Sequence, residues 1–403
     1  MCKIIFSCVF CMIFFPAVAQ QYKTVLPYRM VGGKINAQQT TRWICDTIHY
    51  EYVHDKIIIP VIVNGVKVKY IVDTGGQTGT IRENAVEMKA MSGGTSRGVS
   101  DLNGMALAYE EAVLSNVQLS SNYKLIQMKS MVFPSNGFFR ELGVVGILGS
   151  DAFAQAVVTF DAREQIMIIN YPYRPGGLKI SEGVAIYPGR TSHPIVDVDF
   201  GGITKRVLFD TGANGLLILS ADDYEDLKDK VENRLLSCGI GISGVGIGGF
   251  DLKNTMEMKK VSIGKLNFVG KEFNNMESVT CKGNSLIGVD MLKYGKVVID
   301  YMRNRFYFFS YESETEDMTG ELKNWNVGIL PVKGHFEITA VWDSAKDLVA
   351  LGDQVIRVNG KNLSKLEQSQ LEVEALLDAV EGDVAEIVIL KDGKEKKVEI
   401  KRM

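Results

Sequence analysis

The sequence predicts a mainly β protein with two tandem, related β lobes that form one bilobal unit, followed by a smaller α+β domain. Three observations carry this prediction. An apolar hairpin ending in Asp-Thr-Gly occurs twice. A glycine-ended apolar segment follows each hairpin at nearly the same distance. An acidic stretch then precedes a unit with strand, helix and hairpin signals of its own. The 403 residues are enough for two or three domains.

Composition and charge are those of an ordinary folded protein. Hydrophobic residues make up 46% of the chain and charged residues 23%, with a formal net charge of −3. Nothing in this balance favours nucleic acid as a partner. Apart from its start, the chain has no apolar stretch near the length that crosses a bilayer, so we expect no membrane span.

The first 19 residues have the pattern of an export signal. A short basic start precedes the apolar run Ile4 to Phe15, and Ala17-Val18-Ala19 matches the small-x-small cleavage site. We therefore predict a signal peptide over residues 1–19, with Gln20 as the first mature residue. The protein is expected in the periplasm or outside the cell. Residues 20–44 show no assignable pattern.

Three cysteines remain after that cleavage, namely Cys45, Cys238 and Cys281. An odd number allows at most one disulfide, so the fold must be held by its hydrophobic cores. The three are expected to be small buried hydrophobic residues.

The two hairpins lie at residues 57–75 and 194–212. The first reads IIIPVIVNGVKVKYIVDTG with an Asn-Gly turn, and the second reads PIVDVDFGGITKRVLFDTG with a Gly-Gly turn. Turn chemistry and strand composition both predict β-hairpins. Each hairpin ends in the triplet that begins at Asp73 or Asp210.

The repeat continues beyond the triplets. Ile147-Leu148-Gly149 and Leu286-Ile287-Gly288 occupy matching places, and a strand, a turn and a second strand follow each of them. We therefore predict a first lobe over residues 45–178 and a second over residues 179–312.

The acidic stretch is predicted as a solvated linker over residues 313–324. Beyond it, residues 325–403 are predicted as a separate domain. That domain has a strand ending at Asn359-Gly360, a helix around Glu372–Val380 and a closing hairpin turned at Asp392-Gly393.

Two Asp-Thr-Gly loops in matching repeats point to acid–base chemistry. Loops related by a twofold axis would bring Asp73 and Asp210 face to face, and carboxylates that close cannot both ionise. The ionised member can then activate a water molecule while the protonated member hydrogen-bonds a carbonyl oxygen. This chemistry needs no metal and no cofactor, and the four histidines lack metal-ligand spacing.

Residues 57–310 resemble the aspartic peptidases of the pepsin and retropepsin kind. The resemblance rests on both Asp-Thr-Gly triplets and both apolar-apolar-Gly segments. It implies a catalytic pair, Asp73 and Asp210, and loop-supporting residues at Thr74, Gly75, Thr211 and Gly212. The short units look like two retropepsin subunits fused in one chain, so a monomer should suffice for a complete site. The implied substrate is a peptide or protein.

The residues after the triplets depart from the family pattern. Gly76 and Ala213 stand where the pepsin branch usually has Ser or Thr. A hydroxyl there would stabilise a carboxylate, so its absence predicts activity at weakly acidic or neutral pH. Gly76 also puts the fit of the first loop in question.

Residues 325–403 resemble a PDZ domain of the bacterial, protease-associated type. The match rests on LGDQVIRVNG at residues 351–360 and on LKDGKEKKVEI, which fits the last hairpin of that family. The resemblance implies a domain that binds an extended peptide by strand addition. A structural cap on the lobes is the alternative.

Two further readings of the whole chain stay open. One is a non-catalytic envelope protein that captures peptides in the cleft and in the PDZ-like groove. The other is a regulatory protein in which the PDZ-like domain gates access to the lobes. Substitution of either aspartate separates these readings from an enzyme.

Other motifs are weaker. Gly94–Gly98 matches a nucleophile elbow and Gly239–Gly244 a dinucleotide-binding loop, but neither has the required helix after it. Flaps over the cleft are expected at Ser96–Gly104 and Ser243–Gly249. Four aspartates that recur in register are interpreted as structural, namely Asp151, Asp161, Asp290 and Asp300.

Overall fold

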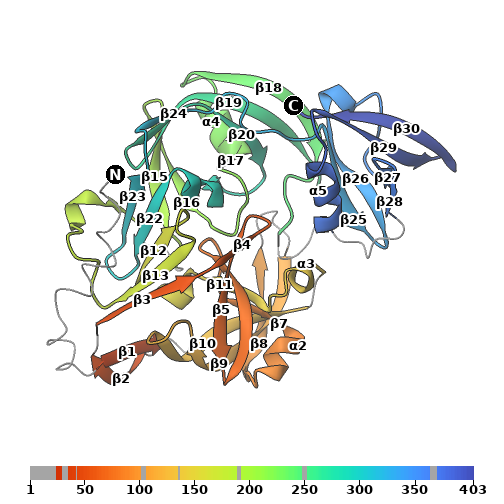
Figure 1. Ribbon diagram of the computed structural model, residues 1–403. Coiled ribbons are helices and arrows are strands. Elements are labelled where there is room, and N and C mark those ends of the chain that lie inside the picture. The colour runs from red at the N-terminus through yellow and green to blue at the C-terminus, as the bar shows by residue number, and fades with distance from the viewer. Residues whose placement is uncertain are drawn as a thin grey trace.

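The computed structural model is mainly β, with two barrel-like lobes and a C-terminal α+β unit (Figure 1), which confirms the predicted fold class. It describes residues 24–29, 35–41, 43–100, 106–134, 137–187, 192–246, 252–363 and 370–403. The predicted signal peptide therefore lies outside the described residues. Part of the unassigned segment 20–44 forms an antiparallel pair of strands, β1 (Thr24–Arg29) and β2 (Ile35–Thr41).

The first lobe is built on an eight-stranded sheet. Its strands, in spatial order, are β4 (Glu51–Val53), β5 (Lys56–Val63), β6 (Val66–Asp73), β11 (Gly146–Gly149), β7 (Gly79–Ile81), β10 (Lys124–Phe133), β9 (Ala106–Gln118) and β8 (Met91–Ser100). An added pairing of β5 with β9 curls the sheet. The predicted turn between β5 and β6 has positive φ at Asn64 (49°) and Gly65 (84°), as a two-residue hairpin loop requires. Two short helices flank the sheet, α2 (Arg82–Glu87) and α3 (Gly137–Glu141).

The second lobe repeats this plan. Its strands, in chain order, are β15 (Ile195–Phe200), β16 (Ile203–Phe209), β17 (Leu217–Ser220), β18 (Asn233–Gly241), β19 (Met256–Phe268), β20 (Lys271–Cys281) and β21 (Leu286–Ile287), with helix α4 (Ala221–Leu227) after β17. In both lobes the strand that leads to the Asp-Thr-Gly triplet pairs parallel with the glycine-ended segment, as β6 with β11 and β16 with β21. The sequence repeat is therefore a repeat of topology.

A third sheet joins the lobes. Its order is β14 (Val184–Ala185), β23 (Arg305–Ser310), β22 (Gly295–Asp300), β12 (Val157–Asp161), β13 (Ile166–Tyr171) and β3 (Ile44–His49). β12 of the first lobe pairs antiparallel with β22 of the second, with Val158 opposite Ile299. The closing strands of each repeat thus form one shared sheet, which the sequence did not reveal.

The hydrophobic core is continuous across the lobes. One cluster of buried side chains runs from Ile57 and Phe153 in the first lobe to Phe209 and Phe306 in the second. The two lobes therefore share one core.

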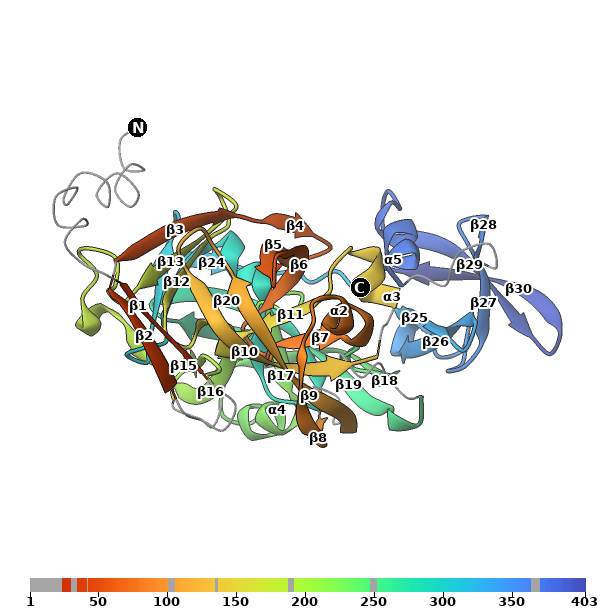
Figure 2. The same cartoon turned by 90° about the horizontal axis from the view of Figure 1, so that it is seen from below.

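The C-terminal unit has a core of its own and lies at one end of the molecule (Figure 2). Its elements are β25 (Val327–Val332), β26 (His335–Trp342), β27 (Gln354–Val358), β28 (Lys361–Asn362), α5 (Gln370–Asp378), β29 (Val384–Lys391) and β30 (Lys394–Lys401). The predicted helix and the hairpin turned at Asp392-Gly393 are both present.

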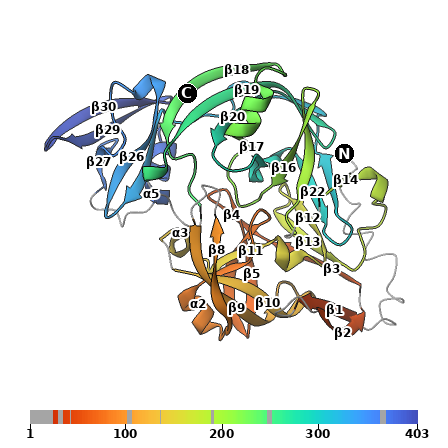
Figure 3. The same ribbon diagram turned by 180° about the vertical axis from the view of Figure 1, so that it is seen from behind.

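The C-terminal unit continues the sheet of the second lobe. β18 pairs antiparallel with β26, and Ile240 lies opposite Val341. Figure 3 gives a view of the C-terminal unit and the second lobe from behind. A Cβ atom on Gly241 would lie 2.5 Å from Ala340 Cα, and one on Gly239 would lie 2.9 Å from the Trp342 ring. The glycines of the supposed dinucleotide motif therefore serve a close approach of two strands.

The acidic stretch, predicted as a solvated linker, is largely exposed but contains a short strand. Residues Thr315–Asp317 form a strand, β24, that pairs parallel with β20. Lys271 is 1% exposed and its ammonium donates to Glu316 Oε1 at 2.9 Å. Met318 is buried as well. The ion pair of Glu316 with the buried Lys271 thus accompanies the pairing of β24 at the edge of the sheet.

The remaining sequence motifs are placed only in part. Gly94–Gly98 lies within β8 and no helix follows it directly, so it is not a nucleophile elbow. The flap predicted at Ser96–Gly104 begins in β8, but residues 101–105 lie outside the described residues. The flap predicted at Ser243–Gly249 also lies partly outside them.

The three cysteines all lie in the described part of the chain and form no disulfide there. Cys281 is buried, as expected, whereas Cys45 and Cys238 are only half-buried.

Candidate active site

The two aspartates stand at equivalent strand ends. Asp73 is the last residue of β6 and pairs with Gly149 of β11, and Asp210 follows β16 directly. The chain turns at once in both places, because the Gly76 N–H donates to the Asp73 carbonyl and the Ala213 N–H to the Asp210 carbonyl, each at 3.2 Å. The sequence repeat therefore gives two loops of the same shape.

The threonines of the two triplets bind each other's loops. The Thr74 hydroxyl donates to the Phe209 carbonyl at 2.8 Å and accepts from the Thr211 N–H at 3.0 Å. The Thr211 hydroxyl does the converse, donating to the Val72 carbonyl at 2.8 Å and accepting from the Thr74 N–H at 3.1 Å. Both threonines are fully buried. These four hydrogen bonds hold the loops in register across the lobe boundary.

The carboxylates lie against the glycines of the opposite loops. A Cβ atom on Gly75 would lie 2.3 Å from Asp210 Cγ, and one on Gly212 would lie 2.5 Å from Asp73 Cγ. The Gly75 N–H donates to Asp210 Oδ1 at 3.2 Å across the boundary. The structure thus brings Asp73 and Asp210 together, and only glycine leaves room for this approach.

The apolar-apolar-Gly segments support the loops from below. A Cβ atom on Gly149 would lie 2.5 Å from the Gly76 carbonyl oxygen, and one on Gly288 would lie 2.3 Å from the Gly215 carbonyl oxygen. The backbone of each segment therefore touches the backbone of its loop, with no space for a side chain. This packing fixes the position of each aspartate loop relative to the strand beneath it.

Burial and the second carboxylate together favour a proton on the pair. Burial raises the pKa of Asp73 well above its usual range, and the negative charge of Asp210 and a hydrogen bond with that residue raise it further. The ammonium of Lys56 and the Gly76 N–H act in the opposite direction. Asp73 Oδ1 is buried without a hydrogen-bond partner among the described residues. Burial and the neighbouring carboxylate thus favour a proton on Asp73 beside Asp210.

Position 76 has a steric reason for glycine. A Cβ atom there would lie 2.8 Å from Asp73 Oδ2. A serine or threonine at this place would force the carboxylate to shift, so Gly76 suits this first loop even though it departs from the family pattern.

Two residues that the sequence analysis did not select also reach the loops. Lys56 is 8% exposed, and its ammonium donates to the Gly212 carbonyl at 2.9 Å. His193 hydrogen-bonds the backbone of Gly76. The signal was present in the sequence, because each residue directly precedes the hairpin of its own repeat.

The recurring aspartates are structural where their contacts are known. Asp151, Asp161 and Asp300 accept backbone N–H groups from Thr78, Glu164 and Arg303. Asp290 forms an ion pair with Lys293 at 2.7 Å. These contacts agree with their interpretation as turn and strand-end caps.

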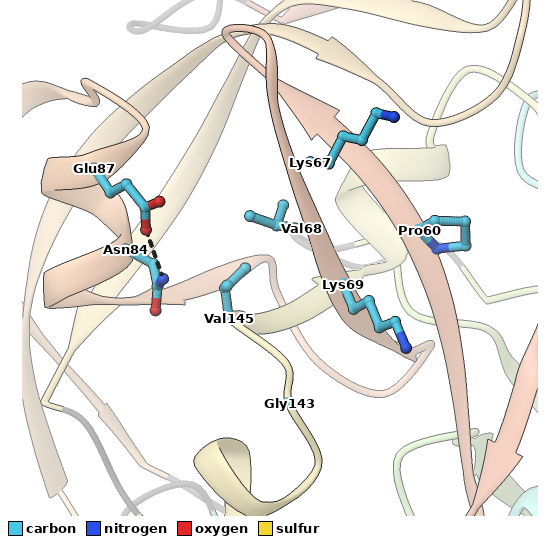
Figure 4. A pocket seen from close by; sticks show the side chains of 8 residues that line it. All are labelled: Pro60, Lys67, Val68, Lys69, Asn84, Glu87, Gly143 and Val145. Carbon is cyan, nitrogen blue, oxygen red and sulfur yellow. Dashed lines mark hydrogen bonds between the residues drawn. The ribbon is translucent and has the colours of Figure 1, made fainter.

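One surface hollow lies in the first lobe, away from the aspartates. It has a volume of about 390 Å³, and its lining residues, shown in Figure 4, are Pro60, Lys67, Val68, Lys69, Asn84, Glu87, Gly143 and Val145. Asn84 donates to Glu87 at 3.2 Å within it, and Lys69 forms an ion pair with Glu51. Its lining includes no residue of the two Asp-Thr-Gly loops, so we assign it no role in catalysis.

Within the described residues, no helix is both long and apolar enough to cross a membrane. The same residues contain no group of three or more His, Cys, Asp or Glu side chains arranged to hold a metal ion.

Among the solved structures to which the chain is similar is a retropepsin-like aspartic protease from Rickettsia conorii. The two sequences are 20% identical over an alignment that covers 32% of this chain and 93% of that one, with a TM-score of 0.24. No protein-family model matches the chain. No curated protein matches it either.

Proposed function

We propose that the protein is an exported aspartic endopeptidase that hydrolyses peptide bonds with a water molecule activated by Asp73 and Asp210. One observation carries this proposal. Two half-buried carboxylates on matching loops lie beside each other, and burial together with the neighbouring charge raises the pKa of Asp73.

The reaction follows from one shared proton. The ionised carboxylate takes a proton from a water molecule while the oxygen of that water attacks the scissile carbonyl carbon. The protonated carboxyl donates a hydrogen bond to the carbonyl oxygen and then its proton, which gives a neutral diol. The diol collapses when one of its hydroxyls returns a proton to the ionised carboxylate. The amide nitrogen accepts the proton that the other carboxyl took from water. The C–N bond breaks, and the pair regains its single proton.

The substrate is a peptide or protein segment in an extended form. Both aspartates belong to one chain and the hydrogen bonds between their loops are intramolecular, so a single chain supplies a complete site. The export pattern of residues 1–19 supports an activity in the periplasm or outside the cell.

A second candidate function is peptide binding by the C-terminal unit. Among the described strands, β25 pairs with β26 alone, and it runs beside helix α5. An open strand edge next to a helix can accept an extended peptide as a further strand. This role suits a PDZ-like domain that delivers substrate to the lobes, and also a protein that captures peptides without cutting them.

The test is cleavage of unfolded casein between pH 3 and pH 8 by the protein from Gln20 onward. Asp73→Asn and Asp210→Asn should each lower kcat by roughly a thousandfold or more, because neither can replace the ionised base or the shared proton. The parent should be most active at weakly acidic to neutral pH. Circular dichroism and thermal unfolding must first show that all three proteins are folded.

Two outcomes would contradict the proposal. Equal turnover by the parent and by Asp210→Asn would mean that another group or a contaminant cleaves the casein. Absence of turnover by the folded parent, combined with saturable peptide binding, would support the binding protein instead.

A further inference from the structure

Lys56 and His193 occupy the same place in the two repeats. Each lies 17 residues before the aspartate of its own repeat, directly ahead of the apolar hairpin. The repeated topology therefore carries both side chains to equivalent positions beside the aspartate loops.

Lys56 crosses from the first lobe to the second. It is the first residue of β5, and its ammonium donates to the Gly212 carbonyl at 2.9 Å and to Asn214 Oδ1. Gly212 is the glycine whose Cα lies against the Asp73 carboxylate. Lys56 thus holds the part of the second loop on which Asp73 rests.

His193 makes the reciprocal connection from the second lobe to the first. It hydrogen-bonds the backbone of Gly76, the glycine that follows the first triplet, and the Gly76 carbonyl also accepts the Ser150 N–H at 3.2 Å. Burial lowers the pKa of His193, so the ring is neutral at neutral pH and still able to donate one N–H. Its Nε2 is buried without a hydrogen-bond partner in the described part of the chain.

The charge of Lys56 is directed at the aspartates. The buried Lys260 and Lys271 form ion pairs with Glu277 and Glu316, whereas Lys56 takes part in no ion pair among the described residues. Burial lowers the pKa of Lys56, and the negative charges of Asp73 and Asp210 are the strongest effects that oppose this. A buried ammonium without its own carboxylate partner is stabilised chiefly by the catalytic pair.

We propose that Lys56 and His193 add a second set of hydrogen bonds between the two aspartate loops, beside that of the threonines, and we call these two residues the clasp. We further propose that the Lys56 ammonium supplies the positive charge that keeps the Asp73–Asp210 pair singly ionised. Lys56 and His193 are both positioning residues, since they act through the loops and through the field at the aspartates. The catalytic part of this inference rests on the proposed peptidase function, whereas the clasp itself does not.

The charged and titratable groups around Lys56 determine in which direction its removal shifts the pKa of Asp73. Lys56 faces Asp73 and Asp210 and also feels Asp55 from its own hairpin and Glu374 from α5. Tyr301 lies within the field of Asp73, and burial keeps that phenol neutral. Removal of Lys56 therefore takes away the stabilising cation and raises the pKa of Asp73 further.

The experiment compares kcat/KM from pH 3 to pH 8 for the full chain and four variants. Lys56→Met removes the charge and the donor, and Lys56→Gln removes only the charge. His193→Ala removes the neutral donor. Lys271→Met is the control, because it also removes a buried lysine, one that lies far along the chain in β20.

Both Lys56 variants should move the acidic limb of the profile to higher pH by about one unit. His193→Ala should lower kcat by roughly tenfold through loss of loop position and leave the limb in place. Lys271→Met should lower stability alone. A limb that stays in place in both Lys56 variants would overturn the electrostatic part of the proposal.

A second measurement does not depend on turnover. The raised pKa of Asp73 in the folded state means that its contribution to stability is present below about pH 4 and is lost as pH rises through the folded-state pKa. Lys56→Met should steepen this loss, so its Tm should fall more between pH 4 and pH 8 than that of Lys271→Met. If the parent shows no turnover but this difference appears, the peptidase function fails and the clasp stands. If Tm falls equally with pH in Lys56→Met and Lys271→Met, the proposed electrostatic role of Lys56 is wrong.

Discussion

At the scale of single residues, the candidate site depends on buried hydroxyls and on missing side chains. Thr74 and Thr211 each satisfy one carbonyl and one N–H of the opposite loop. Gly75 and Gly212 leave the space in which the carboxylates meet. Because none of these groups can be replaced by water in a buried site, each substitution leaves unpaired polar groups or a clash.

Thr74→Val tests the hydroxyl. Valine has nearly the same shape as threonine but leaves the Phe209 carbonyl and the Thr211 N–H unpaired, so the free energy of unfolding should fall by about 2–4 kcal/mol. Thr74→Ser keeps the hydroxyl and should lose much less. Urea denaturation of the two variants measures the difference. The same loss in both would show that packing of the methyl group, and not hydrogen bonding, holds the loops.

At the scale of secondary-structure elements, the strand pair β18 and β26 connects the second lobe to the C-terminal unit. Met258, Ala340 and Trp342 form a small buried cluster at this junction. Since Gly239 and Gly241 allow the two strands to approach, this connection depends on main-chain contact more than on side-chain fit.

Gly241→Val should separate the two elements. The new side chain would start 2.5 Å from Ala340 Cα and must push β26 away from β18. We expect faster proteolytic cleavage between residues 312 and 325 and a larger radius of gyration in X-ray scattering, with the aspartates unaffected. Gly137→Ala is a suitable control, because its Cβ would meet no atom closer than 3.5 Å. An unchanged cleavage rate would show that other contacts hold the unit.

At the scale of the whole molecule, the two lobes are a single folding unit. They share one hydrophobic cluster and one six-stranded sheet in which β12 pairs with β22. The C-terminal unit has a separate core, so it can differ from the lobes in stability while its strand β26 stays attached to them.

Turnover should be proportional to protein concentration. The contacts that assemble the aspartate pair are all within one chain, so dilution cannot dissociate them. We expect constant activity per molecule from about 1 nM to 1 μM, followed with a quenched fluorescent peptide, and a monomer in sedimentation velocity. Activity per molecule that falls on dilution would instead indicate that two chains are needed.

The sequence was sufficient to recognise the repeat and to predict that its two Asp-Thr-Gly loops meet. Strand-and-turn patterns located the two hairpins, the Asp392-Gly393 turn and the closing strands, because these depend on neighbouring residues. The duplicated Asp-Thr-Gly triplets identified Asp73 and Asp210 and the four residues that flank them. A duplicated chain with matching loops implies a twofold arrangement, so the meeting of the aspartates could be predicted.

The contacts that cross between the repeats follow from the packing of the folded chain. The shared sheet, the strand formed by Thr315–Asp317, the pairing of β18 with β26 and the reach of Lys56 and His193 all join residues far apart in the sequence. A local pattern contains no information on which distant backbone will lie beside a glycine or a lysine. These contacts are selected by the packing of whole lobes, because a buried charge or an open strand edge is stable only where another part of the chain meets it.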